Sequence, residues 1–337
     1  MKSQRVRDSK SRRITLAHGN GGRLMRELIE NLRARFSNKF LNELSDAAEF
    51  NIKKERLAFS TDSYVVKPLF FPGGDIGKLA VCGTVNDISM KGARPLFMSL
   101  AFIIEEGFEF SQLERIARSI KREASKAGVL VVTGDIKVVE RGAADGIFIN
   151  TAGIGVINYS RRLGAKARIN DLIVINGGIA EHGMAVLNAR EKLGFKSSIK
   201  SDCRSLNFEV QRCLAASQKI SIMRDLTRGG LATVLSEIAG TSNLGIEICE
   251  KDIPVKPNVK KMCDILGFDP LYVANEGKFV CFVDEKDAAK VKQAPGKEAK
   301  IIGKVTSAHK RGVYLRTKIG STRILPMLES DQLPRIC

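Results

Sequence analysis

The segment RLAFSTDSYVV, residues 56–66, begins the alternation of strands and helices that decides the fold class. Its β-branched and aromatic residues predict a strand that carries Asp62. The stretch LAVCGTVNDISMKGARPLF, residues 79–97, follows and carries Asn86 and Asp87. Apolar residues at helical spacing predict a helix over 113–124. Further strands are predicted at residues 98–104, 129–139 and 146–157. Strands interleaved with helices indicate an α/β or α+β layered fold.

The second half of the chain continues in the same style. Predicted strands lie at residues 171–178, 220–225, 278–284, 300–305 and 312–317, and predicted helices at 181–193, 206–214 and 227–240. The basic stretch at 161–170 is the predicted connection between two domains. We therefore expect a basic disordered leader at 1–13, a glycine loop and helix at 14–45, a first domain at 46–160, a second at 161–325, and a flexible tail at 326–337.

Length and composition limit the class of protein. The chain has 337 residues, of which 44% are hydrophobic, and this is enough for about two domains of roughly 150 residues each. Its apolar runs are strand-length and fall short of the roughly 20 residues that a membrane span needs. The N-terminus has no apolar signal segment. We expect a cytoplasmic protein without a membrane partner.

Cysteine and histidine usage argues against a transition-metal centre. The seven cysteines form no CxxC pair, and most stand among Val, Ile and Phe. They are typical of small buried hydrophobes. Only three histidines are present. A hard cation held by carboxylates is the better expectation.

The net charge is 55 minus 37, or +18, which raises the possibility of nucleic-acid binding. The excess is dispersed outside the first thirteen residues, aromatic residues make up 6%, and Trp is absent. Stacking on bases therefore has little support. We expect acidic partners or anionic substrates and no nucleic acid.

A glycine loop precedes the first predicted helix. It contains His18, Gly19, Asn20, Gly21 and Gly22. A glycine loop at a helix N-terminus presents backbone N–H groups to an anion such as a nucleotide phosphate. The loop matches neither a Walker A motif nor GxGxxG, so a simple turn is the alternative.

Four aspartates share one context. Each lies at or just beyond an apolar run, where α/β sheets collect ligands: Asp62, Asp87, Asp135 and Asp225. Several carboxylates at one place would suit Mg²⁺ bridging nucleotide phosphates. Alternatively, each Asp caps a turn at a strand end.

Three further groups could take part in chemistry. Lys137 stands two residues after Asp135, so the two side chains share a face of the strand; Lys137 could stabilise a phosphoryl group or move a proton, or form a surface ion pair. Glu276 could act as a general base if burial raises its pKa, or be a solvated residue. The turn at 224–230 opens a second helix that could bind phosphate.

The chain closes on LPRIC, residues 333–337. Pro334 disfavours helix and central strand, so we expect a semi-extended arm with the thiol of Cys337 at its tip. Such an arm could carry a group into a pocket. The alternative is an end residue without chemistry.

Together these motifs carry a family resemblance from residue 14 to residue 337. The series LAHGNGGR, STDSYVV, GTVNDISMKGARP, FIIEEGF, VVTGDIKVV, GIFINTAGIG, EHGMAVLNARE, RDLTRGGLA, ANEGKFV and PRIC resembles the HypE family of hydrogenase maturation proteins, the carbamoyl dehydratases. Several motifs recur in the wider PurM-like superfamily of aminoimidazole ribonucleotide synthetase, selenophosphate synthetase and thiamine monophosphate kinase. Leu226 stands where that family has Pro.

The resemblance implies a two-domain PurM-like architecture. The N-terminal domain would dimerise through its sheet into a shared β-barrel, and the second domain would be α/β with a mobile tail. ATP and Mg²⁺ would bind in a cleft between the glycine loop and the aspartates. Asp62, Asp87 and Asp135 would then be metal or phosphate ligands, with Asp225 beside them. Cys337 would be the carrier thiol, and Lys137 and Glu276 would remove protons.

The implied reaction is the ATP-dependent dehydration of an S-carbamoyl group on Cys337 to a thiocyanate. A HypF-type carbamoyltransferase would load the thiol, and a HypC–HypD-type scaffold would accept cyanide for the iron of [NiFe]-hydrogenase. The alternative is a PurM-like enzyme acting on a soluble substrate, of the selenophosphate or thiamine phosphate type. Selenophosphate synthesis would favour a Cys near the glycine loop, and no Cys precedes Cys82.

Overall fold

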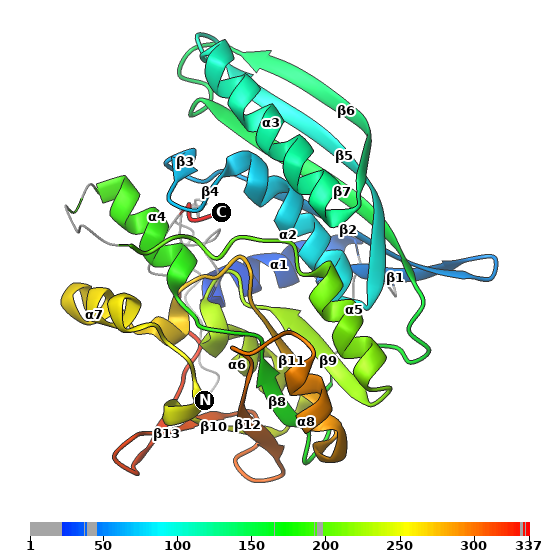
Figure 1. Ribbon diagram of the computed structural model, residues 1–337, viewed down its shortest axis with the longest axis vertical. Coiled ribbons are helices and arrows are strands. Elements are labelled where there is room, and N and C mark those ends of the chain that lie inside the picture. The colour runs from blue at the N-terminus through cyan, green and yellow to red at the C-terminus, as the bar shows by residue number, and fades with distance from the viewer. Residues whose placement is uncertain are drawn as a thin grey trace, which may run out of the picture.

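The computed structural model describes residues 22–36, 38, 46–164, 166–191, 193, 198–330, 333 and 335–337. The predicted leader and four residues of the glycine loop, His18, Gly19, Asn20 and Gly21, lie outside the described residues. Figure 1 shows an N-terminal sheet with two helices in the upper half and a C-terminal sheet with its helices in the lower half. The chain end lies between the two halves, beside α2, α4 and the β3–β4 hairpin.

The N-terminal sheet has five strands in the order β1-β2-β7-β5-β6. Its strands are β1 (Ala48–Ile52), β2 (Glu55–Tyr64), β5 (Ala93–Glu105), β6 (Leu130–Val139) and β7 (Ile147–Ile157). Strands β5 and β6 are parallel, and the other pairs are antiparallel. Helices α2 (Ile76–Met90) and α3 (Phe110–Ala127) cover one face, and the short hairpin of β3 (Phe70–Phe71) and β4 (Gly74–Asp75) leads into α2.

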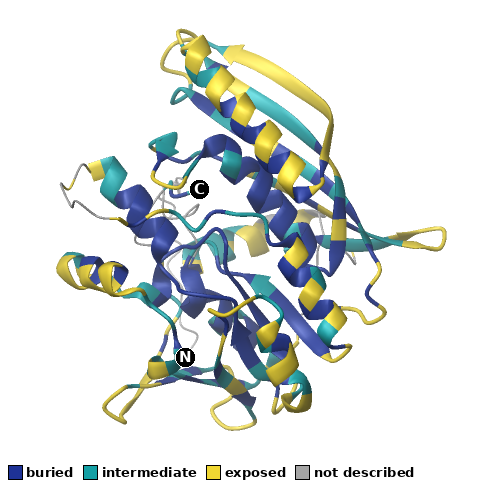
Figure 2. Cartoon of the chain, in the orientation of Figure 1, coloured by how far each residue is buried: buried dark blue, intermediate teal, exposed yellow. Residues whose placement is uncertain are grey.

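Helix α2 is the central element of the molecule. Asp75 caps it by accepting a hydrogen bond from the Lys78 N–H, 3.0 Å, and the chain turns at Gly92, whose φ is +75°. Nearly every residue of α2 is buried (Figure 2), because it packs against the N-terminal sheet on one side and against β9 and α5 of the second half on the other. A helix without a polar face has no amphipathic period, which explains why its sequence predicts no element.

The two faces of the N-terminal sheet differ. Cross-strand partners share a face, and the register aligns Asp62 with Thr151, Thr151 with Leu100, and Leu100 with Gly134. This face is turned toward α2 and α3. Residues one position along, Asp135 among them, therefore project from the opposite, open face. The open face leaves three large apolar side chains 43–45% exposed: Phe59, Phe97 and Ile103.

The C-terminal sheet has seven strands in the order β14-β13-β10-β12-β8-β11-β9. They are β8 (Leu172–Ile175), β9 (Ile220–Asp225), β10 (Gly245–Cys249), β11 (Phe279–Val283), β12 (Lys300–Thr306), β13 (Val313–Arg316) and β14 (Thr322–Ile324). The accompanying helices are α4 (Glu181–Glu191), α5 (Asn207–Ala216), α6 (Gly230–Ser242), α7 (Pro257–Leu266) and α8 (Glu285–Gln293). Strand β11 is buried along its whole length.

The predicted strands and helices are confirmed with small shifts of their ends. Helix α1 (Gly22–Phe36) follows the glycine loop as expected. The helix predicted over 181–193 ends at Glu191, and Leu193 is 37% exposed. Helices α7 and α8 and strands β1 and β10 have no counterpart in the predictions. None of the described helices combines the length and apolarity required to cross a lipid bilayer.

Candidate functional site

Five carboxyl groups from distant parts of the chain meet between the two halves, and we call them the acid cluster: Asp46, Asp62, Asp87, Asp225 and Glu276. Asp62 comes from β2, Asp87 from α2 and Asp225 from the end of β9. The Ser60 hydroxyl donates a hydrogen bond to Asp87, 2.7 Å, and the carboxyl groups of Asp87 and Asp225 lie close enough to influence each other's pKa. The structure thus brings together three of the four predicted aspartates, and it adds Asp46, which sequence reasoning missed.

Burial and mutual repulsion raise the pKa values throughout the acid cluster. Burial lifts the pKa of Asp87 well above its usual range, and the charges of Asp225, Asp46 and Asp62 add to this. Burial and Asp46 raise the pKa of Asp225 to about 7. The pKa of Glu276 is also well above normal, mainly through burial. Such crowding of carboxyl groups is what a bound cation relieves.

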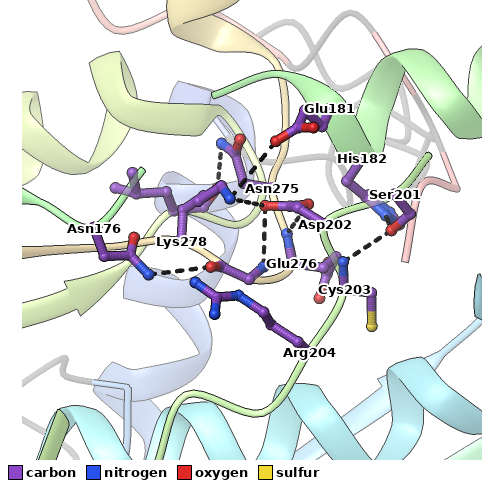
Figure 3. A network of polar contacts seen from close by, with 12 residues as sticks. Asn176, Glu181, His182, Ser201, Asp202, Cys203, Arg204, Asn275, Glu276 and Lys278 are labelled. Carbon is purple, nitrogen blue, oxygen red and sulfur yellow. Dashed lines mark hydrogen bonds and ion pairs between the residues drawn. The ribbon is translucent and has the colours of Figure 1, made fainter. Parts of the chain in front are cut away.

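Glu276 is 3% exposed, and its Oε1 has no hydrogen-bond partner among the described residues. The loop around it is nevertheless tightly held (Figure 3). The Asp202 carboxylate accepts hydrogen bonds from the backbone N–H groups of Glu276 and Gly277, at 3.1 and 3.2 Å, and the buried Lys278 ammonium lies 3.8 Å from Asp202. The backbone is therefore fixed while one oxygen of the side chain is left for a ligand.

Asn86 serves this loop and does not have the ligand position expected from the sequence. It is 2% exposed. Its amide donates to the carbonyls of Arg204, 3.1 Å, and Glu276, 3.3 Å, and its oxygen accepts from the Leu206 N–H, 2.8 Å. All of these bonds are to backbone, so Asn86 joins α2 to the Glu276 loop from behind the site. The cofactor contact predicted for it is replaced by this structural role.

Arg228 is one of the cations that face the acid cluster, and Arg224, paired with Asp46 at 2.6 Å, is another. Arg228 lies in the turn between β9 and α6, and its pKa is raised first by the negative charge of Cys337 and then by Asp62, Glu276 and Asp87. Arg228 thus connects the chain end with the carboxyl groups. The sequence placed it in a possible phosphate-binding turn without a role of its own.

Beside Arg228 lies a cavity of about 300 Å³ between α1, the β9–α6 turn and α6. Apolar side chains line one part and polar groups the other, as in a typical nucleotide or cofactor site. Thr233 is 4% exposed and its hydroxyl has no partner among the described residues. The lining residues are Gly22, Met25, Arg26, Ile29, Glu30, Asp46, Arg224, Thr227, Arg228, Thr233, Val234, Glu237 and Thr241.

The start of α1 differs in part from the expectation for the glycine loop. Gly22, with φ +80°, borders the cavity. The next two N–H groups, of Arg23 and Leu24, donate to the carbonyls of Leu328 and Glu329 at 2.9 and 3.1 Å. These two donors therefore hold the segment that leads to the chain end and are not available to an anion.

Leu226 is the position where the family resemblance leads one to expect Pro. Its side chain is fully buried, and its backbone N–H donates to the Lys278 carbonyl at 3.0 Å. Proline could not make this bond. The substitution therefore ties the β9–α6 turn to the start of β11.

Asp135 and Lys137 do not join the acid cluster of their own chain. Both side chains are more than 60% exposed, and they pair with each other, Nζ to Oδ2, at 2.5 Å. They project from the open face of the sheet, whereas Asp62 projects from the face toward α2. Strand β6 also lies along the upper edge of the N-terminal sheet in Figure 1, away from β9 and α6. The shared face predicted for the pair is confirmed, but their predicted place beside Asp62 and Asp87 is wrong within one chain.

The chain end is docked beside the acid cluster. Leu333 and Ile336 are 5% and 2% exposed and pack into the core around α2 and α4. Val65, three residues after Asp62, donates its N–H to an oxygen of the Cys337 terminal carboxylate at 3.2 Å. Cys337 itself is half-buried. The negative charge of the terminal residue acts on Arg228, which the carboxyl groups of Asp62, Glu276 and Asp87 also face.

Within the described ranges, no three His, Cys, Asp or Glu side chains form a ready-made metal site. Mg²⁺ rarely uses such a cage, because it keeps waters and binds through one or two carboxylates together with substrate phosphates. The crowded carboxyl groups and the free Glu276 oxygen fit that mode of binding.

Comparison with known proteins agrees with this geometry. Residues 44–157 match the AIR synthase related protein N-terminal domain family, and residues 168–316 match the corresponding C-terminal domain family. The carbamoyl dehydratase HypE of Rhodobacter capsulatus is 48% identical, covering 96% of this chain and 98% of that protein.

Two solved structures are similar over nearly the whole chain. The crystal structure of a HypE–HypF complex contains a chain 45% identical with a TM-score of 0.84, covering 91% of this chain and 100% of that one. The crystal structure of HypE in complex with ATP is 45% identical with a TM-score of 0.81, covering 96% and 100%. The chain belongs to the HypE family of carbamoyl dehydratases, within the AIR synthase related proteins.

Proposed function

We propose that this protein dehydrates an S-carbamoyl group on its own Cys337 to a thiocyanate at the expense of ATP, and so supplies cyanide ligands for the iron of [NiFe]-hydrogenase. The observation that carries the proposal is the position of Arg228, which faces Cys337 of the docked chain end and the acid-cluster carboxyls of Asp62 and Glu276 together. An accidental terminal residue would have no reason to be held at such a site.

The cavity beside Arg228 is the proposed nucleotide site. Met25, Ile29 and Val234 offer apolar surface to a base, while Thr233, Arg26 and the N-terminus of α6 offer polar groups to the ribose and phosphates. ATP would supply the phosphoryl group that turns the carbamoyl oxygen into a leaving group. Mg²⁺ held by one or two of Asp62, Asp87 and Asp225 would neutralise the phosphates and lower the pKa values of the nearby carboxyls.

Glu276 is the proposed general base for the carbamoyl nitrogen protons. Its backbone is fixed by Asp202 and Asn86, and its Oε1 is available to a proton. Arg228 would hold the negative charge that develops on the departing oxygen. Burial of Leu333 and Ile336 closes the core next to the thiol and keeps water from the activated carbamoyl group.

Asp135 and Lys137 take part only if a second copy brings them to the site. In the described sheet, β6 has a strand on one side alone, and β1 pairs with β2 only up to Phe59, which leaves residues 60–64 of β2 with an open edge. Two copies that pair β6 with β2 would close a barrel over the apolar open face. They would also place the Asp135 segment next to the partner's strand that carries Asp62. We therefore propose a homodimer with these residues acting in trans.

The proposed partners follow from the chemistry of the thiol. A HypF-type carbamoyltransferase would load it, and a HypC–HypD-type iron scaffold would receive the cyanide. A cytoplasmic location belongs to the same proposal.

The test is intact mass of the protein after incubation with carbamoyl phosphate, ATP, Mg²⁺ and a HypF-type transferase. We expect an adduct on the C-terminal peptide that loses the mass of one water only when ATP is present, and none in Cys337→Ala. If Cys337→Ala instead turns over ATP on a soluble substrate at the wild-type rate, the alternative of a selenophosphate-type or thiamine phosphate-type enzyme replaces this proposal.

A further inference from the structure

Residues 335–337 lie antiparallel to residues 65–67, directly after the strand that carries Asp62. The Val65 N–H donates to a terminal carboxylate oxygen of Cys337 at 3.2 Å, and the Lys67 N–H donates to the Arg335 carbonyl at 3.4 Å. Val65 is thus paired with Cys337, and Lys67 with Arg335. These two hydrogen-bonded pairs, two residues apart on each segment, fix the register of the chain end against residues 65–67. A slip of one residue would move the sulfur by about 3.4 Å and reverse the face from which it projects.

Two side chains of α4 bind backbone carbonyls of the same three-residue segment. His182 Nε2 lies 2.8 Å from the Ile336 carbonyl oxygen, and Arg190 Nη2 donates to the Arg335 carbonyl at 2.5 Å. Arg190 also donates to the Lys67 carbonyl through Nε, 2.8 Å, so it bridges both segments. The carbonyls of Arg335 and Ile336 and the terminal carboxylate of Cys337 therefore each have a donor from the body of the protein.

The hydrogen bonds around His182 determine its tautomer. A carbonyl oxygen can only accept, so Nε2 carries the proton and Nδ1 accepts from the Ser201 hydroxyl, 2.8 Å. Ser201 in turn accepts the Cys203 N–H, 3.0 Å, and Figure 3 shows His182 and Ser201 pointing toward each other. His182 is fully buried, and burial lowers its pKa. It is a neutral, oriented donor whose polar atoms are both satisfied.

Arg335 locks the end of this arrangement. Its φ is +54°, a conformation that a non-glycine residue adopts when its surroundings enforce it. Its guanidinium donates to the Val65 carbonyl at 3.0 Å and to Asp145 at 2.6 Å, and Lys67 binds the same carboxylate at 3.0 Å.

From these contacts we infer that His182 and Arg190, together with Asp145 and the backbone of residues 65–67, form a tail clamp that sets the register of Cys337 for dehydration. The clamp holds main-chain carbonyls and the Arg335 side chain. It therefore acts in the same way on the free, carbamoylated and cyanated thiol. A transferase must release the chain end from the clamp to load it, so the clamp opposes loading and promotes dehydration. This inference deepens the proposed function. The effect of the clamp on dehydration rests on that proposed function.

The first readout needs neither ATP nor a partner. Alkylation of Cys337 by iodoacetamide is followed on the C-terminal peptide by mass spectrometry. Loss of one clamp hydrogen bond in Arg190→Ala or His182→Phe should raise the alkylation rate about five- to tenfold. His182→Gln, whose amide can both donate to Ile336 and accept from Ser201, should restore protection. The matched control is Arg212→Ala, which removes a comparable side-chain bond to the Ala294 carbonyl far from the chain end.

The second readout is the split between two steps under single-turnover conditions. Arg190→Ala and His182→Phe should be loaded by a HypF-type transferase at the wild-type rate or faster, and dehydrate the carbamoyl group about five- to tenfold more slowly. Equal alkylation rates in wild type and Arg190→Ala, or loading and dehydration falling together, would overturn the clamp. Arg190 is half-buried, so its variant decides the question if His182→Phe does not fold. If the variants show the expected alkylation rates but the wild type does not dehydrate its carbamoyl group, the tail clamp is supported and the proposed reaction is wrong.

Discussion

The acid cluster and strand β6 both carry an Asp at the end of an apolar run beside a small residue. The structure places these aspartates in opposite environments. Asp87, which is half-buried, and Asp225, which is buried, lie among other carboxyls and have raised pKa values. Asp135 is exposed beside Lys137, and the hydrogen bond from Lys137 lowers its pKa. The difference comes from strand parity, because Asp62 and Asp135 lie on opposite faces of one sheet. An aspartate in this context is a ligand candidate only on the face that the second domain covers.

The largest effect should come from the acid cluster itself. Glu276→Gln keeps the side-chain volume and removes the proposed base, so dehydration of carbamoylated Cys337 should slow by about 10²- to 10⁴-fold. Single-turnover loss of one water from the C-terminal peptide measures it. Glu123→Gln, another buried glutamate but paired with Arg122 and Lys126 on α3, is the control and should dehydrate normally. A dehydration rate of Glu276→Gln within threefold of the wild-type rate would show that Glu276 is not the catalytic base.

The proposed action of Lys137 of strand β6 in the partner's site can be tested with mixed dimers. Lys137→Ala should lower dehydration by about 10²-fold, the low end for a proton-transfer or charge-stabilising group. Co-expression of Lys137→Ala and Glu276→Gln chains under two affinity tags yields heterodimers. If Lys137 acts across the dimer, one of the two sites is intact and about half of the wild-type activity returns. If it acts within its own chain, both sites are defective and activity stays low. Full activity in Lys137→Ala homodimers would leave β6 outside the reaction.

The third expectation concerns pH and the ligand-free protein. Carboxyls in the unfolded chain titrate near pH 4, whereas in the folded state the pKa of Asp225 is about 7 and those of Asp87 and Glu276 are also raised. Below pH 4 both states are protonated. As the pH rises toward 7, the unfolded chain releases protons that the folded chain retains, so stability falls.

The thermal unfolding temperature should therefore decrease between pH 5 and pH 7.5, by roughly 1–2 °C for each kcal/mol lost. Asp225→Asn should flatten this dependence, and Mg²⁺ with ATP should do the same in the wild type. The exposed pair partner Asp264, when changed to Asn, should leave the slope as it is. A slope that is equal in Asp225→Asn and wild type would mean that the acid cluster does not titrate as a buried group.

Much of the fold could be predicted because its signals are local. Alternating apolar residues mark β2 and β7, and the period of 3.6 marks α3 and α6. The apolar side chains at this spacing are buried along α6, whereas α3 buries Ile116, Ile120 and Ala124 but leaves Ala117 exposed. Helix α2 escaped prediction because it is apolar on every side. Burial of that kind is a property of the tertiary structure, and no periodicity in the sequence reports it.

For the site, residue type was predictable and spatial relation was not. Asp62, Asp87, Asp225 and Glu276 were candidates from context, and they do converge. Asp46 has no comparable motif, and its membership depends on the ion pair with Arg224 at 2.6 Å. Asn86 has the right chemistry for a ligand but turns to backbone carbonyls. Asp135 lies on the opposite face of the sheet from Asp62 because of the register of four neighbouring strands. That register cannot be read from a single sequence.

The burial of α2 against both sheets has a mechanical consequence. Many two-domain enzymes admit their substrate by hinge bending, but here Asn86 and its neighbours join the two halves through one shared helix, which leaves no hinge between them. The halves should behave as a single rigid body during turnover. In the proposed reaction the substrate is a piece of the same chain, so its entry and exit would be movements of the last few residues over a fixed surface. The proposed catalytic cycle therefore involves movement of the C-terminal tail and no opening and closing of one domain against the other.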